Sequence, residues 1–507
     1  MQFNSIQFLV FLPIVVMGYF RLPDKHKNKW LLVASYYFYM CWNAVYALLI
    51  FFSTFSTWIC GNFVSNEKTS ESVRKLSIAT NITINLGILF FYKYYDMFTQ
   101  LVMDVMSKIG ISIQFPALSL LLPVGISFYT FQALGYSIDV YRGTVKHETS
   151  FLNYALFVAF FPQLVAGPIE RSNNLLPQFH KTNRFSYANY QIGMRLMLLG
   201  FFKKIVIADH LSVVLDRYYG SLAYWPGPLL VTGVVLFAIQ VYCDFSAYSD
   251  IARGAAKLIG FDLMMNFDHP YFSKSIAEFW RRWHISLGGW FRDYLFYPVL
   301  RSSLCTKLTR KLTKAKKRKL ARVLPVAIAQ LVVWFSTGLW HGAAWTYVAW
   351  GMLHGIYQII ENIVSVYGNK SKKSILGQFT KIKSFLQICF TFFLVCIGYV
   401  FFRSNTFAEA WYIFSHSISG WGTLLTPVPL IEKTIVMFGS ARVILITFTG
   451  TLLLFIMECI EIKTEKYFPQ LLDNLPGVAR WGIYYAMLMA IAAFGCFEAS
   501  AFIYFQF

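Results

Sequence analysis

Long apolar runs separated by short polar segments dominate the pattern of the chain. The runs cover residues 6–20, 30–64, 76–95, 117–141, 151–169, 189–208, 226–248, 323–360, 384–402, 443–460 and 480–505. A membrane-crossing helix needs about 20 mainly apolar residues, so the two longest runs have room for two crossings or a broken helix. The short alternating segments of a membrane β-barrel are absent. The pattern predicts an all-α integral membrane protein with about 11–13 transmembrane or re-entrant helices.

Composition and charge support this class. Of the 507 residues, 57% are hydrophobic and only 14% are charged, whereas soluble domains carry about 25% charged residues. The net charge is +21, and segment 301–322 holds ten basic residues and no acidic one. Because basic loops face the cytosol, we expect segment 301–322 and the loop at 21–29 in the cytosol and the N-terminus outside. Membrane lipids and an anionic cytosolic ligand are the expected partners, and nucleic acid is not.

Two histidines, His341 and His354, are the only readily titratable side chains in the apolar run 323–360. An ionisable side chain at membrane depth is costly and indicates a functional site. Gly338 and Gly342 weaken the helix beside His341 and let neighbouring backbones approach closely. Burial would keep the imidazole neutral, which is the form that a general base needs. The alternative is a histidine that only bonds to a neighbouring helix.

Residues 279–298, FWRRWHISLGGWFRDYLFYP, repeat aromatic and apolar side chains at helical spacing. The spacing predicts one amphipathic helix at the membrane surface, with His284 on its apolar face and Arg281 and Arg282 on the opposite side. The alternative is an interfacial anchor in which the histidine has no special role.

Residues 242–254, YCDFSAYSDIARG, place Asp250 three positions before Arg253, a spacing that suits an ion pair at a helix end. In the alternative interpretation, Asp244 or Asp250 orients a histidine through its second ring nitrogen. Prolines and glycines in 123–143 and 160–179 predict kinked or re-entrant backbone. No Walker loop, GxGxxG or HExxH motif occurs, so ATP-driven transport, hydride transfer and zinc proteolysis lose support and no metal site is expected.

Five motifs in order along the chain carry a family resemblance. They are PQLVAGPIER, CDFSAYSDIA, FWRRWHISLGGWFRDYLFYP, GLWHGAAWTYVAWGMLHG and the terminal FIYFQF. The sequence resembles the membrane-bound O-acyltransferase family, in its bacterial branch with the alginate O-acetyltransferase membrane subunit. The D-alanyl-lipoteichoic-acid transfer protein is a more distant relative. The resemblance implies a helical bundle around a funnel or tunnel, with His341 catalytic and His284 a second functional histidine. The expected supporting residues are Trp280, Arg281, Arg282, Trp283, Trp340, Asp244 and Asp250.

The resemblance implies an O-acetyltransferase of the cell (cytoplasmic) membrane with no bound cofactor. The expected donor is a cytosolic thioester, acetyl-CoA, and the expected acceptor is a hydroxyl of an exported or cell-wall polysaccharide, reached through an extracytoplasmic partner acetyltransferase. His341 would be the general base, and His284 would orient the donor or stabilise the oxyanion. The alternatives are acyl-carrier-protein-dependent D-alanyl or acyl transfer and a non-enzymatic sugar transporter. We expect N-terminal spans in 1–115, the core in 116–360 and C-terminal spans in 361–507.

Overall fold

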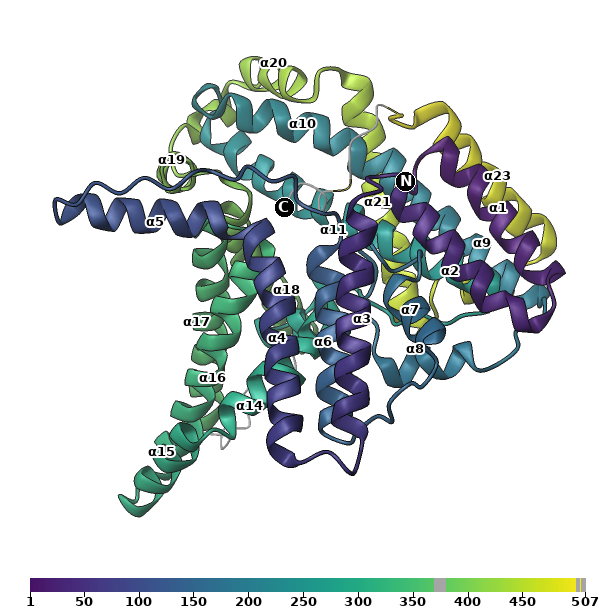
Figure 1. Ribbon diagram of the computed structural model, residues 1–507. Coiled ribbons are helices and arrows are strands. Elements are labelled where there is room, and N and C mark those ends of the chain that lie inside the picture. Colours follow the sequence, from purple (N-terminus) through teal and green to yellow (C-terminus); the bar gives the residue numbers. More distant parts are fainter. Residues whose placement is uncertain (369–379, 498–501, 503–507) are drawn as a thin grey trace. The chain divides into compact units, whose positions relative to one another are not determined.

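The computed structural model describes residues 1–368, 380–497 and 502 (Figure 1). It is 77% helical and has no strand among these residues, which confirms the all-α prediction. The chain forms two compact units, residues 1–197 with 251–264, and residues 198–250 with 265–507. Of the FIYFQF motif, only Phe502 lies within the described residues.

The first unit consists of the N-terminal helices and the end of α11. Its helices are α1 (Ile6–Arg21), α2 (Asp24–Met40), α3 (Tyr46–Ser65), α4 (Glu71–Lys93), α5 (Tyr95–Lys108), α6 (Ile126–Tyr141), α7 (Phe151–Ala159), α8 (Ser172–Phe179) and the start of α9 (Tyr187–Phe201). Run 30–64 is divided between α2 and α3, as its length predicted.

The second unit contains the rest of the chain. Its first half has η1 (Phe202–Ala208), α10 (Asp209–Gly220), η2 (Leu222–Tyr224), most of α11 (Gly227–Ile259), η3 (Pro270–Phe272), α12 (Ile276–Arg282), α13 (Ile285–Phe291), η4 (Arg292–Phe296) and α14 (Tyr297–Leu300). Its second half has α15 (Ser303–Lys314), α16 (Arg318–His341), α17 (Trp345–Tyr367), α18 (Thr380–Arg403), α19 (Phe407–His416), η6 (Trp421–Leu425), α20 (Pro427–Phe438), α21 (Ala441–Thr464), α22 (Phe468–Asp473) and α23 (Gly477–Phe494).

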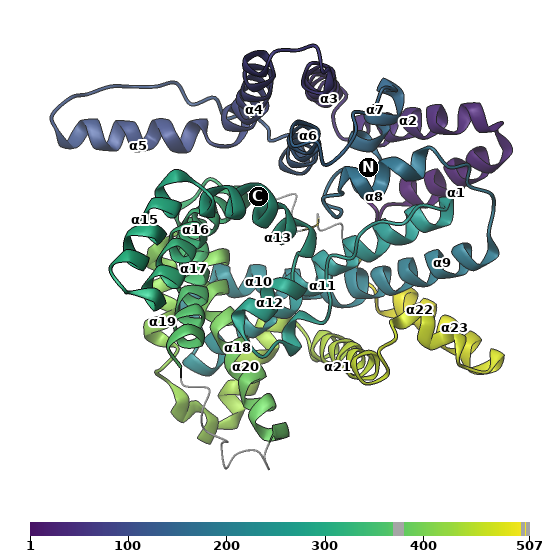
Figure 2. The same cartoon turned by 90° about the horizontal axis from the view of Figure 1, so that it is seen from below.

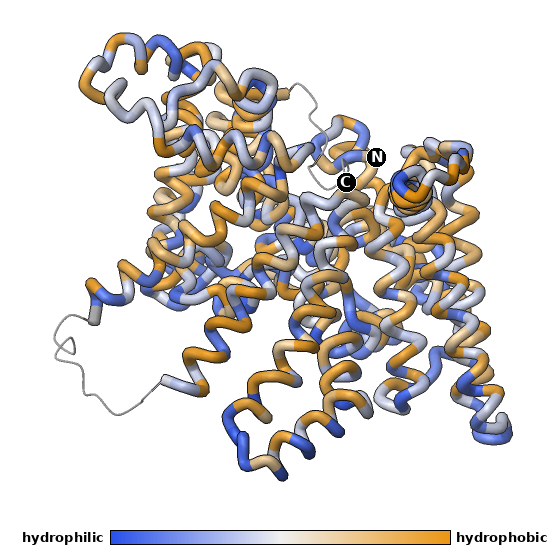
Figure 3. Tube along the Cα trace, turned by 90° about the vertical axis from the view of Figure 1, so that its left-hand side faces the viewer, coloured by the Kyte–Doolittle hydropathy of each residue, from blue (hydrophilic) through white to orange (hydrophobic). Residues whose placement is uncertain are grey.

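Seven helices of the described chain are long and apolar enough to cross a membrane. They are α3, α4, α11, α16, α18, α21 and α23. Hydrophobic residues run along these helices, while hydrophilic residues gather at helix ends and loops (Figure 3). The protein is therefore a multi-pass membrane protein. Several other apolar runs form helices too short for a full crossing.

Polar side chains join three helices of the first unit. Ser53 of α3 donates to Asn85 of α4 at 2.5 Å, Asn85 donates to Asn81 at 3.0 Å, and Asn81 donates to Ser137 of α6 at 3.0 Å. All four residues are buried. Figure 2 looks along these helices and shows them side by side. Interhelical hydrogen bonds of this kind hold helices together where lipid offers no hydrophobic driving force between them.

Irregular backbone occurs where prolines and glycines predicted it. The run 117–141 becomes helical only from Ile126, and residues 160–170 form a fully buried, non-helical segment after α7. Gly125 has a positive φ of 77°, and a Cβ at this position would lie 2.6 Å from the Leu164 carbonyl oxygen. Glycine therefore permits the buried segment to pack against the start of α6.

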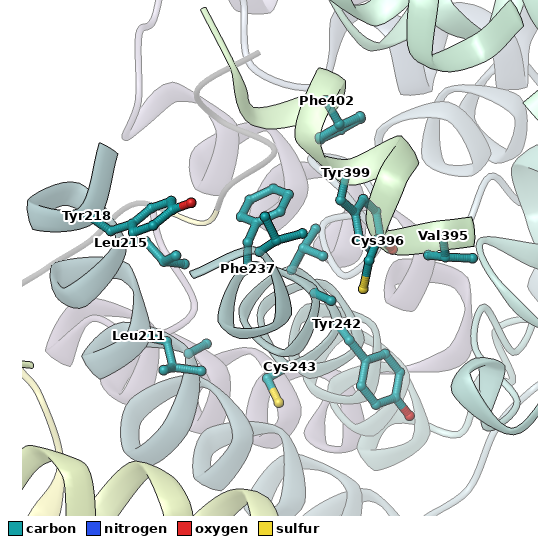
Figure 4. Packing of buried hydrophobic residues seen from close by; sticks show 14 of the residues in the cluster. Leu211, Leu215, Tyr218, Phe237, Tyr242, Cys243, Val395, Cys396, Tyr399 and Phe402 are labelled. Atoms are coloured by element: carbon teal, nitrogen blue, oxygen red, sulfur yellow. The ribbon is translucent and has the colours of Figure 1, made fainter. Parts of the chain in front are cut away.

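Aromatic and aliphatic side chains fill the core of the second unit. Leu211 and Tyr218 of α10, Phe237 of α11, and Tyr399 and Phe402 of α18 belong to one buried cluster (Figure 4). The Phe237 and Tyr399 rings meet edge to face, with centroids 5.7 Å apart. Each such aromatic pair adds about 0.5–1.5 kcal/mol beyond area burial, so this core is a firm support for the neighbouring helices.

The prediction of one continuous helix over 279–298 is wrong. Helix α12 ends at Arg282, and His284 has φ +45° and ψ 53°, in the left-handed region. Backbone contacts with segment 266–268 replace the helical pattern: Asp268 N–H donates to Arg282 O, and Ile285 N–H donates to Asn266 O. A left-handed non-glycine residue costs about 1–2 kcal/mol, and such strain persists where the surrounding structure over-determines it.

Candidate active site around His284 and His341

Helices α16 and α17 form a closely packed hairpin, and the turn between them begins directly after His341. His341 is the last residue of α16, and α17 starts at Trp345. A Cβ on Gly338 would lie 2.6 Å from the Tyr347 carbonyl oxygen, and a Cβ on Gly351 would overlap the Trp334 carbonyl oxygen. The run 323–360 therefore holds two helices, and the predicted close backbone approach beside His341 is confirmed.

The His341 side chain is only 3% exposed and lies among aromatic rings. Its ring centroid is 4.9 Å from Trp340, 4.8 Å from Trp350 and 5.1 Å from Phe402, each in an edge-to-face arrangement. The ring is therefore packed against three aromatic side chains in an apolar environment.

The His284 ring is oriented by Asn266. Asn266 Oδ1 lies 3.2 Å from the Ser286 backbone nitrogen, 2.9 Å from Ser286 Oγ and 3.2 Å from His284 Nδ1. Because a backbone N–H can only donate, the Asn266 atom at this point is its oxygen, and His284 Nδ1 must carry a hydrogen. Burial lowers the pKa of His284 to about 3, so the ring is neutral and its lone pair is on Nε2.

Trp340 contacts both histidines. Its ring centroid is 5.8 Å from His284 and 4.9 Å from His341. The fold thus brings the two histidines that the sequence indicated into contact with one indole. The ring of Phe245 in α11 also meets the His284 ring edge to face, with centroids 4.7 Å apart.

His354 occupies an aromatic cage next to this pair. Trp280 Nε1 donates to His354 Nδ1 at 3.2 Å, and the rings of Trp334 and Trp350 lie 5.6 and 5.3 Å from the histidine. Gly398 of α18 makes room for it, since a Cβ there would lie 2.7 Å from Nε2. Trp280 is therefore a packing partner of His354, and it shares the neighbour Trp350 with His341.

The other residues of the 279–298 segment lie on different sides. Trp283 is buried against Phe267 and Phe279, at 5.0 and 5.5 Å between ring centroids. Arg282 pairs with Glu278 at 2.7 Å, while Arg281 is exposed. Trp283 therefore supports the His284 turn, and of the two predicted arginines Arg281 is the more exposed.

Asp244 and Asp250 contact two buried lysines that the sequence analysis missed. Lys204 pairs with Asp244 at 2.7 Å and Asp209 at 2.8 Å, and Lys203 pairs with Asp250 at 2.9 Å. Burial alone would lower the pKa of Lys204, but the two carboxylates raise it overall. Both lysines lie in the π-helix η1, a form of helix that is frequent at functional sites. The sequence signal that could have revealed these lysines is the presence of ionisable residues inside the apolar run 189–208.

A second missed group lies further along the same unit. Tyr242 donates to Glu458, and His269 lies 2.6 Å from Glu461 and 3.0 Å from Asp268. Burial opposes a charge on His269, but the hydrogen bonds that its ring donates to both carboxylates raise its pKa to about 9. No local pattern in the sequence joins positions so far apart.

Several buried polar atoms of the second unit have no hydrogen-bond partner among the described residues. They include Gln240 Oε1, Ser246 Oγ, Asn266 Nδ2, Trp350 Nε1 and His354 Nε2. An unsatisfied buried polar group costs about 1–3 kcal/mol. These donors and acceptors are therefore suited to binding the polar parts of a substrate.

Two buried histidines that contact one indole within a multi-pass helical bundle form a candidate site for acid–base chemistry. A model of the MBOAT family, the membrane-bound O-acyltransferases, matches residues 144–402. The chain belongs to this family, as the motifs indicated, and it is an acyltransferase.

Individual relatives support this assignment over most of the chain. A probable alginate O-acetylase, AlgI, of Azotobacter vinelandii is 34% identical over 83% of this chain and 78% of its own length. A peptidoglycan O-acetyltransferase of Helicobacter pylori is 31% identical over 80% of this chain and 78% of its own length. A teichoic acid D-alanyltransferase of Bacillus subtilis is 27% identical over 56% of this chain and 69% of its own.

Proposed function

We propose that the protein transfers an acetyl group from cytosolic acetyl-CoA towards hydroxyls of an exported or cell-wall polysaccharide. The names of its alginate and peptidoglycan relatives support acetyl as the group and a cell-wall or exported polymer as the acceptor. The observation that carries the proposal is the contact of both His284 and His341 with Trp340. We place the protein in the cytoplasmic membrane, with an extracytoplasmic acetyltransferase completing the transfer.

His341 acts as the general base in this proposal. It removes the proton from the attacking hydroxyl as the oxygen bonds to the thioester carbonyl carbon. The tetrahedral intermediate then expels the CoA sulfur, and the imidazolium returns the proton to that sulfur. A thioester is already activated, so positioning and one base suffice without a nucleotide triphosphate.

His284 orients the thioester donor rather than stabilising the oxyanion. Its Nδ1–H is engaged with Asn266 Oδ1, so the neutral ring presents only a lone pair at Nε2. A lone pair accepts a hydrogen bond from an N–H or O–H group of the donor and repels an oxyanion. The geometry therefore argues against the oxyanion role that the sequence analysis allowed for His284. The partnerless donor Trp350 Nε1 is better suited to a developing negative charge.

Release of CoA thiol from acetyl-CoA by the purified protein, with acceptor present, tests the proposal. His341→Ala should abolish release while the amount of folded protein stays the same. Turnover by His341→Ala at the normal rate would refute the catalytic assignment.

The alternative donor is an acyl-carrier-protein thioester. The similarity to teichoic acid D-alanyltransferases is the observation in its favour, at lower identity and coverage than the acetyltransferases. Thiol release measured side by side with acetyl-CoA and a D-alanyl carrier-protein thioester separates the two. Family membership favours either enzyme over the non-enzymatic transporter.

A further inference from the structure

The first unit has a cavity of its own, made by the loop that joins α3 to α4 and the loop that follows α6. Its volume is about 850 Å³. The polar and charged residues that line it include Asn62, Asn66, Glu67, Arg74, Lys146 and His147. These residues belong neither to the histidine pair nor to any motif of the resemblance.

His147 is held in the cavity wall by a specific set of contacts. Tyr136 OH lies 2.8 Å from the Glu148 backbone nitrogen and 2.8 Å from His147 Nδ1. The tyrosine oxygen accepts from the Glu148 N–H, so its own hydrogen is directed to His147 Nδ1. A Cβ on Gly61 would lie 2.5 Å from the same nitrogen, so glycine is needed for this docking.

The wall presents hydrogen-bond donors that lack acceptors. Because Nδ1 of His147 accepts, the neutral ring carries its hydrogen on Nε2. This nitrogen and Arg74 Nε are both buried and have no partner in the part of the chain that the structure describes. Lys146 adds an exposed cation, and Glu67 is the one acidic residue of the lining. Converging N–H donors with a cationic excess suit an anion with several oxygens.

The cavity lies where lipid phosphates are found. Helices α3 and α4 are both long and apolar enough to span the membrane, so the loop between them is at the membrane surface. Headgroup phosphates lie at this level, just outside the hydrocarbon core. A basic pocket between helix ends is a known way for proteins to bind anionic headgroups.

We propose that this cavity binds a phosphate ester, held by Arg74, His147 and Lys146. The phosphate of an anionic phospholipid has this chemistry, and so does a soluble phosphate ester. The inference does not depend on the acetyl-transfer proposal, because it concerns binding at different residues.

Native mass spectrometry of the full-length protein with dioleoylphosphatidylglycerol tests the lipid source, and inorganic phosphate tests the soluble source. Arg74→Gln removes the guanidinium, and Gly61→Ala displaces His147 while keeping every charge. Lys68→Gln is the matched control, because it removes an exposed cation from the same loop outside the lining residues. The thermal midpoint of each variant shows whether it remains folded.

We expect phosphatidylglycerol to bind at least about tenfold more weakly to Arg74→Gln and Gly61→Ala, and unchanged to Lys68→Gln, since a charged hydrogen bond contributes about 1.5–3 kcal/mol. If only inorganic phosphate binds, with the same pattern among the variants, the site takes a soluble phosphate. Equal binding by all four proteins, equal loss in Lys68→Gln, or no binding of either probe to the wild type would overturn the proposal. If Gly61→Ala unfolds, the comparison of phosphatidylglycerol binding between Arg74→Gln and Lys68→Gln decides whether the site is correct.

Discussion

Asn266 offers the sharpest test of how the candidate site is built. Its side-chain oxygen accepts hydrogen bonds from the His284 ring, the Ser286 backbone and the Ser286 hydroxyl, all of them buried. Asn266→Ala removes the acceptor that these groups share. A buried donor that loses its acceptor costs about 1–3 kcal/mol, so we expect the free energy of unfolding to fall by at least about 1 kcal/mol. The released His284 ring should lower the turnover rate at least about tenfold.

Asn266→Asp separates the hydrogen bond from simple packing. The substitution keeps an acceptor oxygen, so His284 retains its orientation and most of the activity at pH 7 should remain. The new carboxylate raises the pKa of His284 from its value of about 3, by about 1 to 3 for a close opposite charge. The ring stays neutral at pH 7, but the acidic limb of the pH–rate profile should move to higher pH.

The assay is thiol release from acetyl-CoA measured across pH, together with the thermal midpoint in detergent. Asn474→Ala is the matched control, because Asn474 is exposed and its side chain makes only a 3.4 Å contact with the Gln470 carbonyl. A wild-type rate and pH profile in Asn266→Ala would refute the positioning role. The reasoning also fails if Asn266→Asp is as inactive as Asn266→Ala.

Three further predictions address other parts of the structure. His341→Ala should lower the rate of acetyl transfer by about 10²–10⁴, whereas His416→Ala, an exposed histidine, should match wild type. Gly351→Ala should lower the free energy of unfolding by about 1–3 kcal/mol, because the added methyl group overpacks the α16–α17 crossing. Gly482→Ala should not lower it, because Gly482 has open space around it. Equal thermal midpoints for the two variants would contradict this. The pKa of His269 is raised to about 9, so its charged form contributes stability that is full below pH 6.5 and is lost as the pH rises through 9. Thermal melts of His269→Gln should show a smaller loss of stability over this pH range. An unchanged pH dependence would refute the charged state of His269.

The sequence alone determined the class of the protein and indicated two candidate catalytic side chains. Long apolar runs can only become helices in lipid, because every backbone polar group must be satisfied within the segment. A histidine in such a run stands out for the same energetic reason, which is why His341 could be named without any coordinates. His284 stood out as the polar residue among aromatic ones.

Tertiary structure decided how these side chains are arranged. The periodicity of 279–298 predicts a helix, but backbone bonds from segment 266–268 break it at His284. The roles of Asn266, Lys203 and Lys204 could not be predicted, because each depends on partners that are distant in the sequence. Local propensity depends on neighbours in sequence, whereas a hydrogen-bond partner or a ring contact depends on which segments pack together. Packing therefore fixed the tautomer of His284 and the contact of Trp340 with both histidines.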